Sequence, residues 1–328
     1  MTTQETAPEA GPTGRRAPAI SIIGAGRAGS ALAAALSDAG FGVVAVHSLS
    51  PTSAERVSAR TGAEVVQTAI AAVLRADITL LTVPDSAIAR IAATVAATGS
   101  VLRDRAVVHC SGAQGRDALA ALRQHGAAVG VAHPLQALTR DVESGVAALR
   151  GTFFGVDADE RIRPTIEMLV RAIGGIPFVA PEGDRAVYHA AAVLAGNAPL
   201  ALLSRAAELL VSAGVDASVA GPALAGLLEG AARNARALGV EKALTGPVVR
   251  DDAATLARHL EALRNDQQLQ RLYYRLARET LRAAGATGRE HVAELLARPA
   301  PSRAATRDAV ARRVAARSAT QPARLAAR

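Results

Sequence analysis

The chain has 328 residues, half of them hydrophobic and a fifth charged, which predicts a globular protein of about two domains. Four phenylalanines, three tyrosines and no tryptophan disfavour a single-stranded nucleic-acid binder, because such proteins stack bases on aromatic side chains. Residues 299–328 hold seven arginines and one aspartate, +6 of the formal charge of +8, so the remaining chain is nearly neutral. A single cysteine, Cys110, excludes an intramolecular disulfide framework and a multi-cysteine metal site, and we predict no bound metal.

Residues 1–17 and 299–328 have the composition of flexible tails. The first 18 residues lack the apolar core of a signal peptide. The longest stretch without a charged side chain, Ala186–Ser204, contains histidine, asparagine and proline, which favours a buried core helix over a membrane span. We therefore expect a cytoplasmic, soluble protein with no membrane partner and no nucleic-acid partner.

Apolar runs typical of strands alternate with helical segments, such as 30–38 and 86–97, from Ala19 to Glu182. This alternation predicts right-handed βαβ units and a mostly parallel sheet covered on both faces. The predicted strands are Ala19–Ile23, Gly42–His47, Glu64–Gln67, Ile78–Val83, Ala106–Cys110, Ala128–Ala132, Thr152–Val156 and Ile176–Ala180.

After about Gly183 the strand pattern ends and only helices are predicted. Glycines at 214, 239 and 285 are expected to stop helices, and Asp251 and Asp266 to cap helix N-termini. The predicted helices are 184–213, 218–237, 251–263, 266–284 and 289–297.

The predicted fold class is therefore α/β: an N-terminal Rossmann domain with a doubly wound, mostly parallel sheet, followed by an all-helical C-terminal domain. We expect the Rossmann domain over residues 18–182 and a helical substrate and dimerisation domain over residues 183–298, with a homodimer as the assembly.

A glycine-rich segment follows the first predicted strand and opens a helix. A first glycine permits the tight turn, a second lets the backbone approach a pyrophosphate, and a third lets helix and strand pack closely. We therefore predict a dinucleotide site formed by Gly24, Gly26, Arg27, Ala28 and Gly29.

The end of the second predicted strand favours NADP as the cofactor. NAD sites usually carry Asp or Glu there, and this chain has none at the expected position, since Asp38 and Glu55 lie outside it. Ser48, Ser50 and Arg56 could bind a 2′-phosphate, and Arg27 could add charge or stack on adenine. Arg56 could equally be an ordinary solvated helix residue.

Further candidates follow the later strands, because strand C-termini form the ligand crevice of a doubly wound sheet. Val83, Pro84 and Ser111 are predicted to lie near the cofactor. His109 and His133 end two successive strands and are candidate catalytic residues, although a strand-end histidine is often structural. Cys110 is more often a small buried thiol than a nucleophile.

The helical part supplies the remaining candidates. His189 and Asn197 lie eight residues apart on one helix face. Buried polar side chains need hydrogen-bond partners, which here are either structural neighbours or a bound substrate. Thr245 and Arg250 lie in a turn before a helix and either bind an anionic substrate or form a plain interhelical loop.

Together these motifs resemble a bacterial family that joins a Rossmann-like domain to a C-terminal helical domain of uncharacterised function, within the 6-phosphogluconate dehydrogenase-like superfamily. The motifs that carry the resemblance are GAGRAG, His109-Cys110-Ser111-Gly112, His133-Pro134-Leu135-Gln136, Tyr188-His189-Ala190-Ala191-Ala192, Asn197 and Leu244-Thr245-Gly246-Pro247. They span about Ala19 to Glu294.

The resemblance implies an NADP-dependent reductase related to ketopantoate reductases and pyrroline-5-carboxylate reductases, and pantothenate biosynthesis as a setting. The expected reaction is hydride transfer to a small 2-oxo acid, with ketopantoate as the first candidate. An imine or deazaflavin-type NADP reductase and a non-catalytic NADP-binding sensor are the alternatives.

Two positions depart from what the resemblance implies. Hydroxyacid relatives place a catalytic lysine four residues before the asparagine, where this chain has Val193. His189 is therefore the first candidate proton donor, with Asn197 donating a hydrogen bond, and Lys242, the only lysine, as a competitor. The second departure is Asp251, where the resemblance implies glycine.

Overall fold

The computed structural model describes residues 16–181 and 183–297. It contains two compact units, Met1–Ala201 and Leu202–Arg328, and the division falls within one long helix. The predicted domain boundary at 182/183 stays a prediction. The predicted tails lie outside the described residues, except for Arg16 and Ala17.

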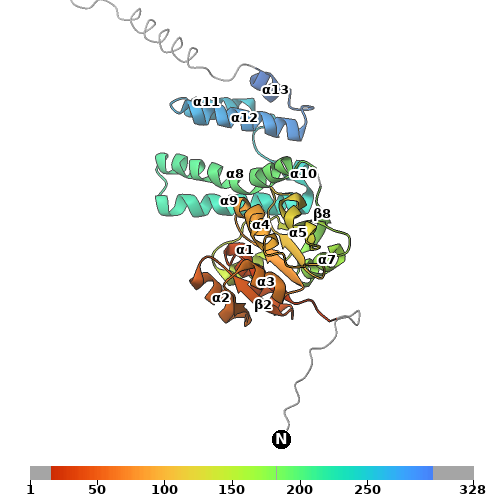
Figure 1. Ribbon diagram of the computed structural model, residues 1–328. Coiled ribbons are helices and arrows are strands. Elements are labelled where there is room, and N and C mark those ends of the chain that lie inside the picture. Colours follow the sequence, from red (N-terminus) through yellow and green to blue (C-terminus); the bar gives the residue numbers. More distant parts are fainter. Residues whose placement is uncertain (1–15, 182, 298–328) are drawn as a thin grey trace, which may run out of the picture. The chain divides into compact units, whose positions relative to one another are not determined.

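The first unit, coloured from red to green in Figure 1, is built on an eight-stranded sheet. The strand order is β3-β2-β1-β4-β5-β6-β7-β8. Every pairing is parallel except that of β6 with β7, so the predicted α/β class with a mostly parallel sheet is confirmed. All eight predicted strands are present, most of them shorter by one or two residues at an end, while β6 and β7 extend two residues beyond their predicted ends. Their bounds are β1 Ile20–Ile23, β2 Val43–His47, β3 Glu64–Val65, β4 Ile78–Leu81, β5 Ala106–His109, β6 Ala128–Pro134, β7 Phe153–Ala158 and β8 Ile176–Val179.

Helices cover both faces of this sheet, so every residue of the central strands β1, β4 and β5 is buried. One core cluster joins the sheet to α1 (Arg27–Asp38), α2 (Pro51–Thr61), α6 (Val142–Leu149) and α7 (Arg163–Ala172). The other joins it to α3 (Ala69–Arg75), α4 (Asp85–Ala96), a 3₁₀ turn (Arg116–Leu119) and α5 (Ala120–Gln124).

Strand order reverses at β1, which pairs with β2 on one side and with β4 on the other. In open α/β sheets the crevice outside the carboxyl ends of the strands at such a point is where ligands bind. The turn from β1 into α1 and the residues after β4 both lie there, so the topology itself selects this end of the sheet.

A buried ion pair fixes the start of the long helix α8 (Arg185–Ser212) to the sheet. Arg185 and Asp157 of β7 are 6% and 4% exposed, and their side chains meet at 2.7 Å. Arg116 binds the other carboxylate oxygen of Asp157 at 2.6 Å. The first turn of α8 is therefore held against β7 by a carboxylate that two guanidinium groups share.

The rest of α8 was predicted to be a buried core helix, and this is wrong for the described chain. Only Arg185 of α8 is buried, while Leu194 and Leu200 are 69% and 56% exposed. Apolar residues occur all round the helix, so no single neighbouring face could cover them. By length and hydropathy α8 is the one described helix that could cross a membrane, which alone is weak evidence. The cytoplasmic location stays a prediction.

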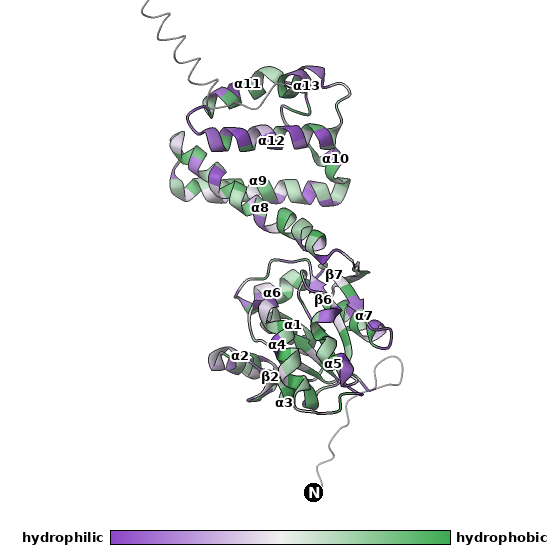
Figure 2. Ribbon diagram, turned by 45° about the horizontal axis from the view of Figure 1, so that its top comes forward, coloured by the Kyte–Doolittle hydropathy of each residue, from purple (hydrophilic) through white to green (hydrophobic). Residues whose placement is uncertain are grey.

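The helices after α8 are α9 (Ala217–Leu238), α10 (Val240–Ala243), α11 (Ala253–Ala262), α12 (Gln267–Ala284) and α13 (Glu290–Ala297). The last three enclose a small core that includes Leu256, Tyr274 and Val292, and Figure 2 shows the strongly hydrophilic residues along α12. Glycines 214, 239 and 285 have positive φ angles at helix ends, as predicted.

The predicted caps were half correct. Asp266 caps α12 by accepting a hydrogen bond from the N–H of Leu269, as expected. Asp252, and not Asp251, caps α11, where it accepts from Thr255 N. Asp251 has φ +55° instead, and its carboxylate accepts the N–H of Val292 at the start of α13. Position 251 thus has the left-handed backbone that suits the glycine implied by the resemblance, and Asp is among the residues that tolerate it.

The buried ion pair gives a stability prediction. Asp157→Asn should lower the free energy of unfolding by about 3–5 kcal/mol, because it leaves the buried Arg185 without a charge partner. As a matched control, Glu167→Ala breaks the exposed pair with Arg171 and should cost less than about 1 kcal/mol. Urea unfolding followed by circular dichroism measures both, and equal effects of the two changes would contradict the prediction.

Candidate functional site

The glycine-rich turn between β1 and α1 leaves no room for side chains at two of its glycines. Gly24 has φ +101°, and a Cβ there would lie 2.7 Å from the carbonyl oxygen of Thr82. A Cβ on Gly29 would overlap the carbonyl oxygen of Gly24 and the hydroxyl of Thr82. Gly26, in contrast, faces open space, with nothing within 4 Å of the position a Cβ would take. This pattern leaves the backbone at Gly26 accessible to a ligand.

The start of α1 suits an anion. Its N-cap is Gly26, which offers no capping side chain, and the first turn contains no acidic residue. Unpaired backbone N–H groups and the helix dipole therefore both favour negative charge at this point. The turn fits the pyrophosphate of a dinucleotide, with Gly24, Gly26, Arg27, Ala28 and Gly29 as the residues that would hold it.

A cavity of about 360 Å³ opens beside this turn. The predicted Arg27 and Arg56 both line it, and three residues missed by the sequence analysis, Ser30, Ser53 and Arg140, line it with them. Arg56 donates a hydrogen bond to the Ser53 hydroxyl at 3.1 Å. Hydroxyl and guanidinium groups are suited to bind a phosphate, and the preference for NADP stays a prediction.

Ser48 and Ser50 take local roles near this cavity and do not line it. Ser50 is the N-cap of α2, where its side chain accepts a hydrogen bond from Ser53 N. The Ser48 hydroxyl accepts from Ser50 N at 3.3 Å. Their phosphate contacts stay a prediction.

The other predicted cofactor residues follow β4 and β5. Pro84 precedes α4 as its N-cap, and the Val83 side chain lies against Gly24. The hydroxyl of Ser111 accepts from the N–H groups of Ala113 and Gln114 and so shapes the loop after β5. Each lies at the carboxyl end of the sheet, and their contacts with a cofactor stay predictions.

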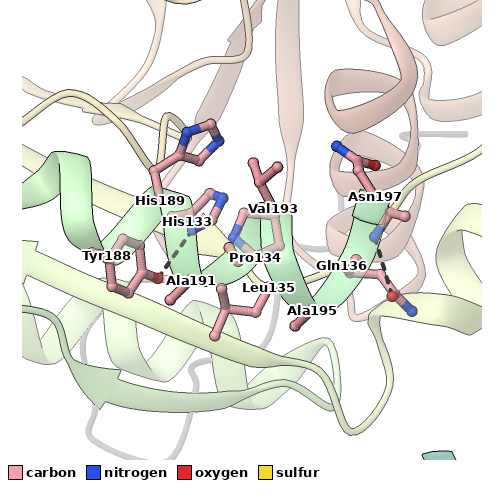
Figure 3. A pocket seen from close by; sticks show the side chains of 13 residues that line it. His133, Pro134, Leu135, Gln136, Tyr188, His189, Ala191, Val193, Ala195 and Asn197 are labelled. Atoms are coloured by element: carbon pink, nitrogen blue, oxygen red, sulfur yellow. Dashed lines mark hydrogen bonds between the residues drawn. The ribbon is translucent and has the colours of Figure 1, made fainter. Parts of the chain in front are cut away.

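A second cavity, of about 560 Å³, lies where β6 ends and α8 begins (Figure 3). Three of the predicted catalytic residues, His133, His189 and Asn197, line it together with Val193. Most of the remaining wall is apolar. The other lining residues are Pro134, Leu135, Gln136, Ala137, Tyr188, Ala191, Ala192, Ala195 and Gly196.

Tyr188 is the candidate in this second cavity to which the sequence analysis assigns no role. Its hydroxyl lies 3.0 Å from Nδ1 of His133, as the dashed line in Figure 3 shows. The His133 ring in turn lies 6.4 Å, centroid to centroid, from the ring of His189. Tyr188 directly precedes His189 in the sequence. Only the tertiary fold brings its hydroxyl to His133, which lies 55 residues earlier in the chain.

Two glycines make room for this pair. A Cβ on Gly112 would lie 2.7 Å from the His133 ring, and one on Gly155 would lie 2.5 Å from the Tyr188 hydroxyl. The backbone of the β5 loop and of β7 therefore sets where the two side chains meet.

Burial keeps both groups of the pair neutral. Desolvation, with the nearby His189 and Arg185, lowers the pKa of His133 to about 4. Desolvation also raises the pKa of Tyr188 above its usual 10. At neutral pH the pair therefore consists of an uncharged imidazole and a protonated phenol.

His109 and Cys110 are held away from this chemistry. His109 is fully buried; its Nε2 bonds to Gly115 O at 3.0 Å and its Nδ1 accepts from Ser111 N at 3.2 Å. Burial lowers the pKa of His109 and raises the pKa of Cys110 to about 12. Both ring nitrogens of His109 are engaged with backbone, so we do not assign it a proton-transfer role.

The predicted substrate residues Thr245 and Arg250 belong to the second unit. They flank a turn in which Gly246 has φ +98° and accepts a hydrogen bond from Arg250 N. Both side chains are exposed. Their contact with substrate stays a prediction. Among the described residues, no group of three or more His, Cys, Asp or Glu side chains could hold a metal ion.

Comparisons with known proteins agree with this architecture. Residues 5–134 match the model of a Rossmann-like domain, and residues 152–280 match the domain of unknown function DUF2520. The comparison with curated proteins gave no match.

Solved structures share the fold over most of the chain. A putative NADP oxidoreductase from Bacteroides fragilis is 26% identical with a TM-score of 0.63, covering 80% of this chain and 98% of its own. An imine reductase from Pseudomonas sp. is 20% identical with a TM-score of 0.54, covering 76% and 88%. A pyrroline-5-carboxylate reductase from Coxiella burnetii is 18% identical with a TM-score of 0.54, covering 82% and 98%.

The lowered pKa of His133 predicts how stability depends on pH. Between pH 6.5 and about 4 the unfolded imidazole binds a proton that the folded one does not, so stability falls as the pH drops through that window. From pH 7 to pH 5, His133→Gln should lose about 1–2 kcal/mol less stability than the wild type. Chemical unfolding at the two pH values measures this, and parallel losses in both proteins would refute it.

Proposed function

We propose that the protein is an NADP-dependent reductase that transfers a hydride to a C=N or C=O carbon of a small substrate. The observation that carries the proposal is the Tyr188–His133 pair on the wall of a largely apolar cavity, in the same unit as a dinucleotide cradle. The similarity to a putative NADP oxidoreductase, an imine reductase and a pyrroline-5-carboxylate reductase supports the reaction class.

The cavity favours an imine over a 2-oxo acid. The described residues that line it include no arginine or lysine, so they offer no cation for a substrate carboxylate. A small cyclic imine with an apolar ring suits an apolar wall with neutral donors. Ketopantoate remains the second candidate, and the sequence-based prediction that Thr245 and Arg250 bind a substrate carboxylate belongs to it.

When bound, the nicotinamide supplies the hydride. The protein must then supply a proton to the substrate nitrogen or oxygen, and Tyr188 is protonated at neutral pH and lines the cavity. With the proton on Nδ1, His133 donates to the phenol oxygen and stabilises the phenolate as the proton leaves. Asn197 of α8 lines the same cavity, and in this proposal it would orient the substrate by a hydrogen bond.

His189 competes with Tyr188 for the donor role, because it lines the same cavity. Its neighbours on the helix face are Val193 and Asn197, which line the cavity with it. Lys242, on α10 of the second unit, is exposed. Substitution of Tyr188, His189 or Lys242 therefore distinguishes the three candidate proton donors.

The test is single-turnover oxidation of NADPH and of NADH against a panel of small cyclic imines and 2-oxo acids. We expect NADPH to be preferred and imines to react fastest. Tyr188→Phe should slow hydride transfer about 10²–10⁴-fold with unchanged cofactor affinity, while Lys242→Ala should not. Calorimetry suits the affinity measurement, because the chain has no tryptophan.

Three outcomes would contradict parts of this proposal. A large loss in His189→Ala but not in Tyr188→Phe moves the donor role to His189. Tighter binding of NADH overturns the cofactor assignment. Cofactor binding without turnover of any substrate favours the non-catalytic sensor.

We also propose that the protein is a homodimer whose interface includes α8 and α9. The exposed apolar side chains of these helices, such as Leu194, Leu200 and Leu227, support it, since apolar surface of this extent is typical of an interface. Sedimentation equilibrium should give a dimer that Leu227→Glu weakens. Leu49→Glu, at a leucine outside these helices that is 93% exposed against 70% for Leu227, is the control. A monomeric wild type would exclude the dimer.

A further inference from the structure

Three arginines from three separate elements line the 360 Å³ cavity beside the glycine-rich turn. Arg27 is the first residue of α1, Arg56 lies within α2, and Arg140 lies in the loop between β6 and α6. No acidic side chain is among the described residues that line this cavity. Converging guanidinium groups without a carboxylate form a site for a highly charged anion.

Three acidic side chains near these arginines are engaged by other groups. Arg60, one helical turn beyond Arg56, binds Asp38 at 2.8 Å and Glu143 at 3.1 Å. Asp141, directly after Arg140, caps α6 by accepting from Ser144 N. Among the described residues, no ion pair involves Arg27, Arg56 or Arg140, so the charge of this cavity is left for a ligand.

The position of the cavity points to the adenosine side of the cofactor. Ser53 and Arg56 lie in α2, which follows the second strand, and in a Rossmann domain the residues after that strand meet the adenosine ribose. A 2′-phosphate there carries up to two negative charges and accepts several hydrogen bonds.

We propose that Arg140 binds the 2′-phosphate of NADP together with Arg56, and thereby couples cofactor binding to the substrate cavity. This inference rests on the proposed NADP dependence and adds a residue far from the glycine-rich motif in sequence.

The coupling follows from the loop that carries Arg140. Leu135, Gln136 and Ala137 at one end of the loop line the 560 Å³ cavity, as Figure 3 shows for the first two, while Arg140 and Val142 at its other end line the 360 Å³ cavity. A phosphate that holds Arg140 therefore also restrains the wall against which the substrate lies.

The two ends of the loop are anchored differently. At the substrate end, Leu135 N donates to Phe153 O at 2.9 Å and the Gln136 amide donates to Ala148 O at 3.1 Å. At the other end, Asp141 caps α6 by accepting from Ser144 N at 2.8 Å, whereas the Arg140 side chain is exposed and makes no hydrogen bond within the described residues. A phosphate bound to Arg140 would therefore add a contact at the one point of this end where the side chain has no partner within the described residues.

The first experiment measures binding of two nucleotide probes by calorimetry, so it requires no turnover. 2′,5′-ADP carries the 2′-phosphate and 5′-AMP lacks it. Arg140→Ala should weaken 2′,5′-ADP binding about 10–100-fold and 5′-AMP binding less than about twofold. Arg140→Lys should recover part of the loss. Arg60→Ala removes the same charge one turn from Arg56, outside the cavity, and should change neither probe more than about twofold.

The results separate this inference from the proposed function. Unchanged 2′,5′-ADP binding in Arg140→Ala, or an equal loss for both probes, would overturn the assignment of Arg140. A selective loss supports it even if no substrate in the panel is reduced.

The second experiment tests the coupling by hydrogen exchange of the backbone over residues 135–141 in the full chain. NADP⁺ should slow exchange there more than NAD⁺ does, with both at saturating concentration, and Arg140→Ala should abolish the difference. Equal protection by the two nucleotides in the wild type, or a difference that survives in Arg140→Ala, would overturn the coupling.

Discussion

The buried contact between Asp157 and Arg185 is the constraint on which the candidate active site depends. It joins β7 to the first turn of α8, and three residues later α8 presents Tyr188 to His133 at the end of β6. A buried charge without a partner is costly, so Arg185 has to stay next to the Asp157 carboxylate. This contact fixes the position of the first turn of α8. Because β7 pairs with β6, the same contact fixes the distance between the phenol and the imidazole.

Small residues complete this arrangement where larger ones would break it. The glycines at 112 and 155 admit the His133 and Tyr188 side chains, and those at 24 and 29 let β1, α1 and the residue after β4 pack together. At each of these glycines, another group of the protein occupies the space that a side chain would need. Gly26 differs, since the space at its backbone is open, as a nucleotide-binding turn requires.

The proposed proton donation depends on Tyr188 and His133 both being uncharged at neutral pH. Burial lowers the pKa of His133 and raises that of Tyr188, so the pair carries a proton that can be donated without a formal charge being buried beforehand. Arg27, Arg56 and Arg140 instead line the other cavity of the first unit, where we propose that the anionic cofactor binds. A single loop, from Leu135 to Arg140, contacts both places.

Local sequence patterns determined much of this protein. Alternating strand and helix signals predicted all eight strands and the mostly parallel sheet, and the spacing of GAGRAG predicted the dinucleotide turn, because both depend on backbone geometry over a few residues. Sequence also identified His133, His189 and Asn197, which the structure brings to one cavity. Tertiary structure alone decided the rest. The pairing of Tyr188 with His133, the approach of Arg140 to Arg56 and the engagement of both His109 nitrogens join residues through packing of separate elements, and no local periodicity encodes such contacts. The exposure of α8 was equally beyond the sequence, since a helix that is apolar all round indicates burial without showing what covers it.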